Sequence, residues 1–217
     1  MKTFVKITGL TDPAVVALVP DGGAAGFVID VPGAPGSITA EKAAELVDAV
    51  PREAEAWGVV VAPSADTVHR LFDDVGLDRI QVYGTIPPDL EFLEIHHLVP
   101  SLPIAAPGAG GTLPPVPPAE DYARLHLDAP GEPWTHGSRE LIDWALAREL
   151  VDAQPGRKVA IAGGLTPANV AEAIRTVGPW GVDVSQGVER APGAIDADQV
   201  RAFLAAIEAL ERPATSS

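Results

Sequence analysis

The stretch Ile161-Ala-Gly-Gly-Leu-Thr-Pro-Ala-Asn-Val170, followed by Gly181-Val-Asp-Val-Ser-Gln-Gly-Val-Glu189, decides the expected fold of this chain. Residues 159–162 form a short apolar run, which is typical of a strand buried on both faces. Gly163-Gly164 permits a tight turn with bare backbone N–H groups. Thr166-Pro167 supplies an N-cap and an N1 proline for a helix over 168–177. The sequence therefore predicts a βα unit that leads into a second strand and a second glycine turn.

The two glycine turns, Gly163-Gly164 and Gln186-Gly187, stand about one βα unit apart in the chain. At the same end of a parallel sheet, such turns can converge on one phosphate through backbone N–H groups and a helix N-terminus. The alternative is that they are two ordinary βα turns without a ligand. We favour the phosphate site, because both turns have the same small-residue chemistry.

Strand-like apolar runs alternate with helical patterns along the whole chain. The expected strands are 4–8, 25–30, 58–62, 79–83, 94–99, 123–128, 158–162 and 181–185. The expected helices are 12–19, 39–50, 64–75, 87–93, 138–152, 167–177 and 196–210. This order indicates an α/β fold with a parallel, buried sheet, closed as a single (β/α)8 TIM barrel over residues 1–211. Residues 212–217 are expected to form a disordered tail.

The least regular stretch, residues 100–118, is rich in proline, glycine and alanine. It is either a mobile loop above an active site or a long, weakly ordered excursion, and we favour the excursion.

Composition excludes several classes of function. The 217 residues are 47% hydrophobic, so they can form a large core, and the net charge of −15 with no basic run argues against nucleic acid or an anionic membrane surface. The chain has no cysteine, which excludes disulfides, thiolate metal sites and a cysteine base. No signal-peptide pattern and no apolar run near the roughly 18 residues of a membrane span is present, so we predict a soluble cytoplasmic protein. No spacing of histidine and carboxylate residues suggests a metal site, and no cofactor is expected.

Several motifs give the chain a resemblance to the phosphoribosylanthranilate isomerase family. Lys6-Ile-Thr-Gly-Leu-Thr11, Ile80-Gln-Val-Tyr-Gly84 and Leu127-Asp128 are similar to the family's motifs, as are both glycine turns quoted above. The resemblance implies a (β/α)8 enzyme of tryptophan synthesis. It further implies an Amadori rearrangement of N-(5-phosphoribosyl)anthranilate to the carboxyphenylamino-deoxyribulose phosphate, so that the partner is a phosphorylated sugar conjugate. Family members occur as monomers or homodimers.

The catalytic face departs from the family pattern. Thr8 stands where the family has its cysteine base, and a threonine hydroxyl alone cannot accept the C2 proton because its pKa lies far above neutrality. Gly36 replaces the arginine that holds the anthranilate end. His136 lies in the loop that replaces Gly-Gly-Thr-Gly, and Ser185-Gln186 replaces Ser-Ser. Asp128, the family's acid, is retained.

Inward side chains recur at every second residue of a barrel strand, and this alternation selects further candidates. Asp30 ends the second strand, so it is a candidate base opposite the acid Asp128. The alternative is that Asp30 only caps the turn that follows it. Lys6 and Asp183 lie on strands that become adjacent when the barrel closes, and we expect a buried ion pair. His126, one layer below Asp128, is predicted to be a core histidine rather than a proton shuttle.

The candidates fall into three groups. The catalytic candidates are Asp128, Thr8 and Asp30; the phosphate-binding candidates are Gly163, Gly164, Gln186 and Gly187; the remaining pocket candidates are Lys6, Gly36, Tyr83, His136, Asp183 and Ser185. Three functions are compatible with these residues. The first is the isomerase activity of the family, impaired or redirected. The second is a paralogue with new chemistry in specialised metabolism, and the third is a non-catalytic binder of a phosphorylated ligand.

Overall fold

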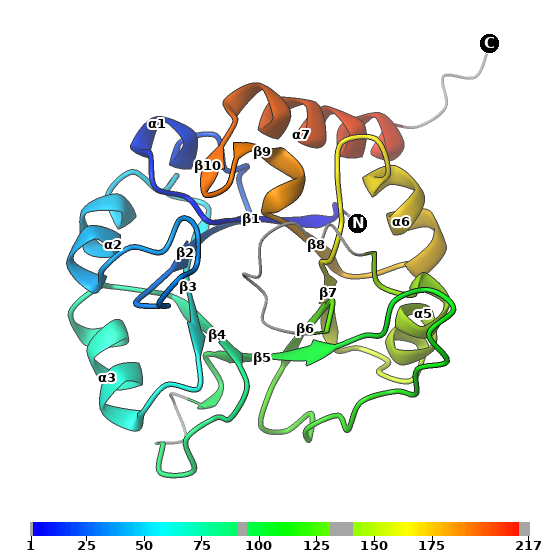
Figure 1. The fold of residues 1–217 in the computed structure, drawn as a ribbon, viewed down its shortest axis with the longest axis horizontal. Coiled ribbons are helices and arrows are strands. Elements are labelled where there is room, and N and C mark those ends of the chain that lie inside the picture. Colours follow the sequence, from blue (N-terminus) through cyan, green and yellow to red (C-terminus); the bar gives the residue numbers. More distant parts are fainter. Residues whose placement is uncertain (1, 91–94, 131–140, 213–217) are drawn as a thin grey trace.

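Eight parallel strands close into a barrel in the order of the chain, and helices surround it (Figure 1). The computed structural model describes residues 2–90, 95–130 and 141–212. The strands are β1 (Phe4–Thr8), β2 (Ala24–Val28), β3 (Glu55–Val61), β4 (Arg79–Tyr83), β5 (Leu98–Pro103), β6 (Arg124–Asp128), β7 (Lys158–Ile161) and β8 (Gly181–Val184). The helices are α1 (Pro13–Val16), α2 (Ala40–Val47), α3 (Ala65–Asp73), α5 (Trp144–Asp152), α6 (Val170–Val177) and α7 (Ala197–Glu211). The predicted (β/α)8 barrel is confirmed, because β1 pairs with both β2 and β8.

After β8, the chain forms the short 3-10 helix η1 (Gln186–Val188) and an antiparallel hairpin of β9 (Glu189–Ala191) and β10 (Ala194–Ile195) before α7. The hairpin lies beside β1 at the top of the view in Figure 1. The barrel and its helices thus extend from Phe4 to Glu211. Of the tail expected to be disordered, residues 213–217 lie outside the described residues.

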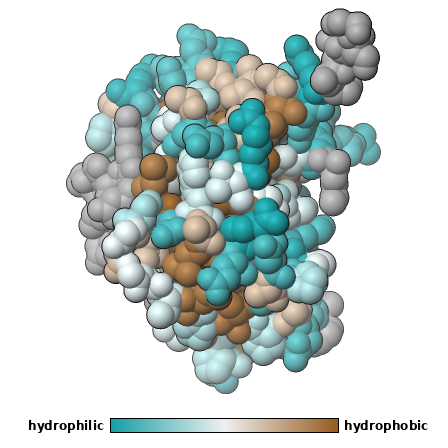
Figure 2. All heavy atoms as spheres, turned by 90° about the vertical axis from the view of Figure 1, so that its right-hand side faces the viewer, coloured by the Kyte–Doolittle hydropathy of each residue, from teal (hydrophilic) through white to brown (hydrophobic). Residues whose placement is uncertain are grey.

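The helices form where capping residues precede amphipathic segments. Side-chain oxygens of Thr39, Ser64, Asp143 and Asp196 accept hydrogen bonds from backbone N–H groups in the first turns of α2, α3, α5 and α7. The apolar faces of these helices pack on the outward side chains of the strands, in one large cluster. Seen from the side of α5 and α6, hydrophilic residues cover much of the outer surface, with apolar residues in patches between them (Figure 2).

The barrel interior is layered along its axis. Phe4, Trp57, Val99 and Ala24 form an apolar cluster near the N-terminal ends of the strands. Near the C-terminal ends, a smaller apolar cluster is formed by Val28, Val31 and Val59. Between them lies a buried polar layer made of Lys6, Thr8, Gln81, His126 and Asp183. A polar layer inside a packed barrel is costly unless every group finds a partner, so its hydrogen bonds decide what the site can do.

Several elements differ from the prediction in their bounds, and the differences at β5 and α6 have clear local causes. The fifth strand is β5, Leu98–Pro103, rather than residues 94–99, because the prolines at 100 and 103 resemble loop signals although both pair with neighbouring strands. Residues 104–123 then return to β6 without a helix, and Arg157 fastens the end of this segment through the carbonyls of Pro117, Pro118 and Tyr122.

The start of α6 also differs. Its N-cap is Asn169, not Thr166, because residues 166–169 form a separate turn in which the Thr166 N–H donates to Asn169 Oδ1 at 2.8 Å. The Asn169 amide also donates to the Gly164 carbonyl at 3.0 Å, so this side chain closes the glycine turn. Of the predicted helix over 87–93, the described residues 87–90 form no helix, and in the predicted helix over 138–152 the described residues 141–143 precede α5 without joining it. Residues 91–93 and 138–140 lie outside the described residues.

Ala62, which follows β3, has a left-handed backbone with φ +41, and its N–H donates to the Tyr83 carbonyl at 2.8 Å. This conformation costs an L-residue about 1 kcal/mol, and glycine avoids the cost. We therefore expect Ala62→Gly to raise the free energy of unfolding by about 0.5–1 kcal/mol in urea titrations. Ala44→Gly in the middle of α2 is the matched control and should lower it by about 1 kcal/mol. A loss of stability in both variants would contradict the strain at Ala62.

Candidate active site

The centre of the site is a hydrogen-bonded group of Lys6, Thr8 and Asp183. The register of β1 against β8 places Lys6 opposite Asp183, and the two side chains form a buried ion pair with Nζ 2.7 Å from Oδ2. The predicted pair is confirmed. Thr8 Oγ1 donates to Asp183 Oδ1 at 2.7 Å and accepts a hydrogen bond from Lys6 Nζ. A Cβ on Gly26, opposite Thr8 on β2, would lie 2.6 Å from Thr8 Oγ1, so glycine leaves room for this hydroxyl.

His126 joins this group from β6. Its Nε2 lies 3.0 Å from Asp183 Oδ2, while its Nδ1 lies 2.9 Å from Ser101 Oγ and 3.1 Å from Gln81 Nε2. His126 is thus a buried histidine, as expected, but it contacts a candidate site residue directly. Gln81 and Ser101 were not among the candidates predicted from the sequence. Because inward side chains alternate along a strand, Gln81 could have been selected from its position two residues before Tyr83. Ser101 could not, because the fifth strand was predicted to end at residue 99.

Asp128, the last residue of β6, lies at the C-terminal end of the barrel. Its Oδ2 accepts a 2.6 Å hydrogen bond from the Tyr83 hydroxyl, and its Oδ1 accepts from the Ala129 N–H at 2.7 Å. Burial raises the pKa of Asp128, although nearby His126 and these hydrogen bonds oppose the shift. Burial also raises the pKa of Tyr83 well above its ordinary value. A carboxyl group with a raised pKa at this end of a barrel is suited to donate a proton.

Asp183 has the opposite shift. Burial opposes its ionisation, but the charge of Lys6 and the hydrogen bonds from His126 and Lys6 outweigh burial and lower the pKa of Asp183 to about 2. Burial lowers the pKa of Lys6, and the neighbouring Asp183 only partly compensates. The site therefore contains two carboxyl groups whose pKa values are moved apart, an arrangement that separates acid from base roles.

The glycine turns contact each other. Gly163 and Gly164 have φ +78 and +65, which only glycine adopts readily. A Cβ on Gly187 would lie 1.7 Å from the Leu165 carbonyl oxygen, so the turn after β8 packs directly on the turn after β7. Within the described residues, the N–H groups of Gly163, Gly164, Gln186 and Gly187 donate no hydrogen bond to another protein group. The two turns therefore lie in contact, and these backbone N–H groups have no partner among the described residues.

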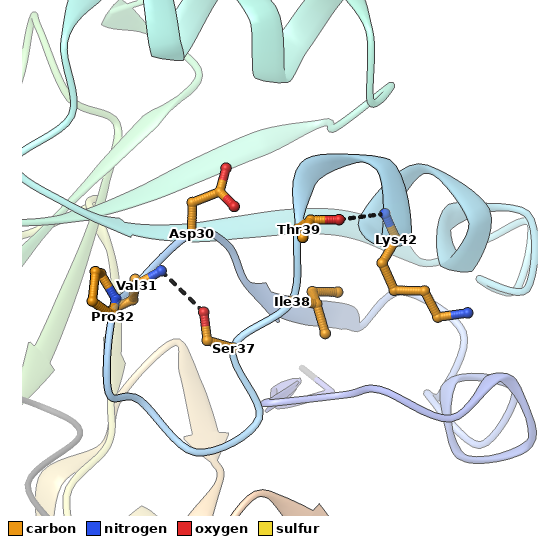
Figure 3. Close-up of a pocket in the computed structure, with 7 residues that line it drawn as sticks. All are labelled: Asp30, Val31, Pro32, Ser37, Ile38, Thr39 and Lys42. Carbon is orange, nitrogen blue, oxygen red and sulfur yellow. Dashed lines mark hydrogen bonds between the residues drawn. The ribbon is translucent and has the colours of Figure 1, made fainter.

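Asp30 does not join the site. It has φ +52, which breaks the strand alternation, and β2 already ends at Val28. Its side chain is 48% exposed and lies 3.6 Å from Arg70 on α3, outside the barrel. In Figure 3 the Asp30 carboxylate extends away from Ser37, whose hydroxyl accepts from the Val31 N–H at 3.0 Å. The prediction that Asp30 is the base opposite Asp128 is wrong, because a left-handed residue directs its side chain to the outer helices.

The hollow drawn in Figure 3 lies beside the first turn of α2, where Asp30, Ile38 and Lys42 are among its lining residues. Lys42 is paired with Glu45 at 2.8 Å on the same helix. The hollow therefore presents no free cation to an anionic ligand, and we assign it no part in the site.

Gly36 and Ser185 lie at the rim near β1. A Cβ on Gly36 would be 3.4 Å from both the Gly9 carbonyl oxygen and Gly193 Cα, and Ser185 Oγ lies 3.4 Å from the corresponding position on Gly9. Gly36 has φ +74, so we expect Gly36→Arg, which would restore the family's cation, to lower the free energy of unfolding by about 1–2 kcal/mol. Thermal unfolding would measure this loss, and Gly33→Arg should lose a similar amount, because Gly33 has φ +77 although no atom lies near its Cβ position. Equal melting temperatures for Gly36→Arg and the wild type would contradict the expectation.

His136 falls outside the described residues, so its predicted contact is not located. Within the part of the chain that is described, no cluster of three or more histidine and carboxylate side chains is arranged to hold a metal ion. The described helices also include none with the length and apolar character needed to cross a membrane.

Fold and site together define a (β/α)8-barrel protein with a buried carboxyl group of raised pKa and two glycine turns in contact at the C-terminal ends of its strands. Comparison with known families then narrows this class. The model for "N-(5'phosphoribosyl)anthranilate (PRA) isomerase" matches residues 5–206, and the chain belongs to this family.

Relatives and solved structures agree. The N-(5'-phosphoribosyl)anthranilate isomerase of Haloferax volcanii is 38% identical, over 94% of this chain and 92% of the relative. That of Paramagnetospirillum magneticum is 35% identical, over 95% and 97%. The phosphoribosyl anthranilate isomerase structure from Thermus thermophilus has a TM-score of 0.76 at 29% identity and covers 96% of this chain and 100% of its own. Another isomerase structure, in complex with reduced 1-(o-carboxyphenylamino)-1-deoxyribulose 5-phosphate, has a TM-score of 0.71 at 26% identity, over 95% of this chain and 99% of its own.

Proposed function

We propose that this chain isomerises N-(5'-phosphoribosyl)anthranilate to 1-(o-carboxyphenylamino)-1-deoxyribulose 5-phosphate, without cofactor or metal, in the cytoplasm. The observation that carries the proposal is the environment of the Asp128 carboxyl group. In a chain of this family, the carboxyl group that ends β6 has a raised pKa and is held by Tyr83 and the Ala129 N–H. This group would protonate the ring oxygen as the furanose opens to the Schiff base.

The phosphate would bind across the ends of β7 and β8. The bare N–H groups of Gly163, Gly164, Gln186 and Gly187 support this placement, since backbone donors bind a phosphate without a side-chain charge. Such donors suit a chain whose net charge is −15, because the overall field repels an anion and local dipoles must overcome it.

The anthranilate end would bind near Gly36, Ser185 and Tyr83. Gly36 offers no cation for a carboxylate, so binding there would rely on hydrogen bonds and on packing against the rim. We therefore expect a higher KM than in a family member that has the arginine, with the phosphate end supplying most of the binding energy.

The test is turnover by the purified protein. Wild type should convert N-(5'-phosphoribosyl)anthranilate to the ketose phosphate, followed by chromatography, and should restore growth of a tryptophan auxotroph that lacks the isomerase. A chain that binds the product analogue without any turnover, and that fails to complement at high expression, would favour a non-catalytic binder. Turnover of a different phosphoribosyl conjugate only would favour a paralogue with new chemistry. Light scattering would decide between the monomer and the homodimer.

A further inference from the structure

We propose that Thr8 and Asp183 together form the base of the reaction, with Thr8 Oγ1 taking the C2 proton while its own proton passes to Asp183 Oδ1. The inference rests on the proposed function and supplies the group that the lost cysteine leaves missing. It also replaces Asp30, which faces Arg70 outside the barrel.

The direction of the hydrogen bonds carries the inference. Lys6 Nζ can only donate, so Thr8 Oγ1 accepts from it, and the single Thr8 hydroxyl proton goes to Asp183 Oδ1 at 2.7 Å. A hydroxyl has two lone pairs, and Lys6 occupies only one. The second lone pair of Oγ1 is therefore available to a substrate proton, while the acceptor for the displaced proton is already in contact.

Position explains why two residues are needed. Asp183 lies opposite Lys6 in the β1–β8 register, and Thr8 is two residues further toward the C-terminal end of the barrel. Asp183 and Thr8 are each 5% exposed, but Asp183 also binds His126 and Lys6 through its other oxygen, Oδ2. The Asp183 carboxylate is therefore already held by hydrogen bonds below the strand ends. Thr8, the last residue of β1, lies between this carboxylate and the mouth of the barrel.

His126 fixes the orientation of Asp183. The ionised Asp183 carboxylate can only accept, so His126 Nε2 carries a proton and donates it to Asp183 Oδ2. Oδ2 is then held by His126 and Lys6, which leaves Oδ1 for Thr8. His126 is a positioning residue in this arrangement, because it acts through Asp183 and not on the substrate.

The proton balance closes. When the C2–H bond of the Schiff base breaks, its electron pair forms the C1–C2 double bond, and the iminium nitrogen recovers the C=N pair as an enamine. The proton joins Thr8 Oγ1, and the former Oγ1 proton makes Asp183 neutral. As the enaminol becomes the ketone, Thr8 returns a proton to C1 and Asp183 returns one to Thr8. The 2-hydroxyl proton goes to Asp128, which lost its own proton to the ring oxygen.

The charged surroundings suit this division of roles. Asp183 faces Lys6 on β1 and His126 on β6. Burial opposes its ionisation, but the charge of Lys6 and the hydrogen bonds from both residues lower its pKa to about 2. Asp128 and the Tyr83 hydroxyl lie nearer the mouth, where burial raises the pKa of Asp128. A pH range therefore exists in which Asp183 is ionised while Asp128 holds its proton, as an acid and a base that work together require.

Thr8→Val and Thr8→Ser form a matched pair for the test. Valine keeps the branched shape and the Lys6–Asp183 ion pair but removes the hydroxyl, whereas serine keeps the hydroxyl. We expect Thr8→Val to lower kcat by about 10²-fold with KM changed less than about threefold, and Thr8→Ser to stay within about tenfold of the wild type. With substrate deuterated at C2, the isotope effect on kcat should be larger in Thr8→Val than in the wild type, because proton transfer becomes the slow step.

A double variant tests the connection to Asp183. If Thr8 and Asp183 act as one unit, Thr8→Val with Asp183→Asn should be no slower than the slower single variant. If the two losses in kcat multiply in the double variant, the proton relay from Thr8 to Asp183 is wrong. A Thr8→Val enzyme as fast as the wild type would also overturn this relay. Should Asp183→Asn fail to fold, the Thr8 pair and its isotope effect decide alone. A wild type with no turnover would overturn the proposed function and the relay together, whereas an active wild type with an unaffected Thr8→Val would overturn only the relay.

Discussion

Asp128→Asn is expected to lower kcat by about 10³-fold, because the neighbouring Tyr83 hydroxyl, with a pKa raised well above its ordinary value, is too weak an acid to replace the carboxyl group. Asparagine has nearly the same shape and can still accept from the Ala129 N–H, but it cannot give a proton to the ring oxygen. In the wild type, kcat/KM should fall as the pH rises through the pKa of Asp128, since the acid must be protonated to act. Steady-state kinetics over a pH series would measure both effects.

The stability of Asp128→Asn provides the control. Burial raises the folded-state pKa of Asp128 above its unfolded value, so this group contributes stability below the unfolded pKa and loses it as the pH rises through the folded pKa. Above its folded-state pKa the ionised, buried carboxylate therefore costs stability, and a neutral asparagine does not. We expect the variant to unfold at the same temperature as the wild type or above it. An inactive variant that melts much earlier would mean that Asp128 acts on the fold rather than on the substrate.

Periodicity and turn chemistry predict most of the barrel, and the errors have local causes. The predicted strands over residues 4–8 and 79–83 coincide with β1 and β4. Strands that are buried on both faces consist mostly of apolar residues, so they can be located in the sequence. The fifth strand was predicted too early in the chain because Pro100 and Pro103 lie within β5 and resemble loop signals. Proline is tolerated in a strand where its missing N–H is not needed to pair with the neighbouring strand. The start of α6 was misplaced because the Asn169 side chain closes a turn that competes with the cap at Thr166.

Site residues could be predicted where they end a strand, but not where a left-handed backbone conformation sets the direction of the side chain. Asp128 and the glycine turns follow from their place in strand–turn motifs. Asp30 looked equivalent to Asp128, but φ +52 reverses its side chain, and no sequence signal distinguishes it from an ordinary strand end. The site still contains two carboxyl groups, but the one that accompanies Asp128 is Asp183 rather than Asp30. Asp183 was expected only as an ion pair with Lys6, and its contacts with Thr8 and His126 required three strands brought together by closure.

Lys6→Met is expected to lower the free energy of unfolding by about 3–5 kcal/mol, the largest stability loss of a single substitution discussed. Methionine fills a similar volume, so the loss isolates the charge. Lys6 is 1% exposed and its Nζ contacts Asp183 Oδ2 at 2.7 Å, so removing it leaves a buried carboxylate with only the Thr8 and His126 donors. Thermal unfolding at pH 7 should show a drop of about 10 °C for a domain of this size.

The pH dependence of the loss identifies its cause. The pKa of Asp183 is about 2, below its unfolded value, so the carboxylate stabilises the fold above the unfolded pKa and this stability disappears as the pH falls through about 2. Without Lys6 the pKa of Asp183 rises, so the gap between Lys6→Met and the wild type should narrow as the pH falls below 4. Adding Asp183→Asn should recover much of the loss at pH 7, because it removes the unpaired charge. A gap that is constant from pH 7 to pH 3, or a double variant less stable than Lys6→Met, would show that packing of the lysine stem, rather than its charge, stabilises the polar layer.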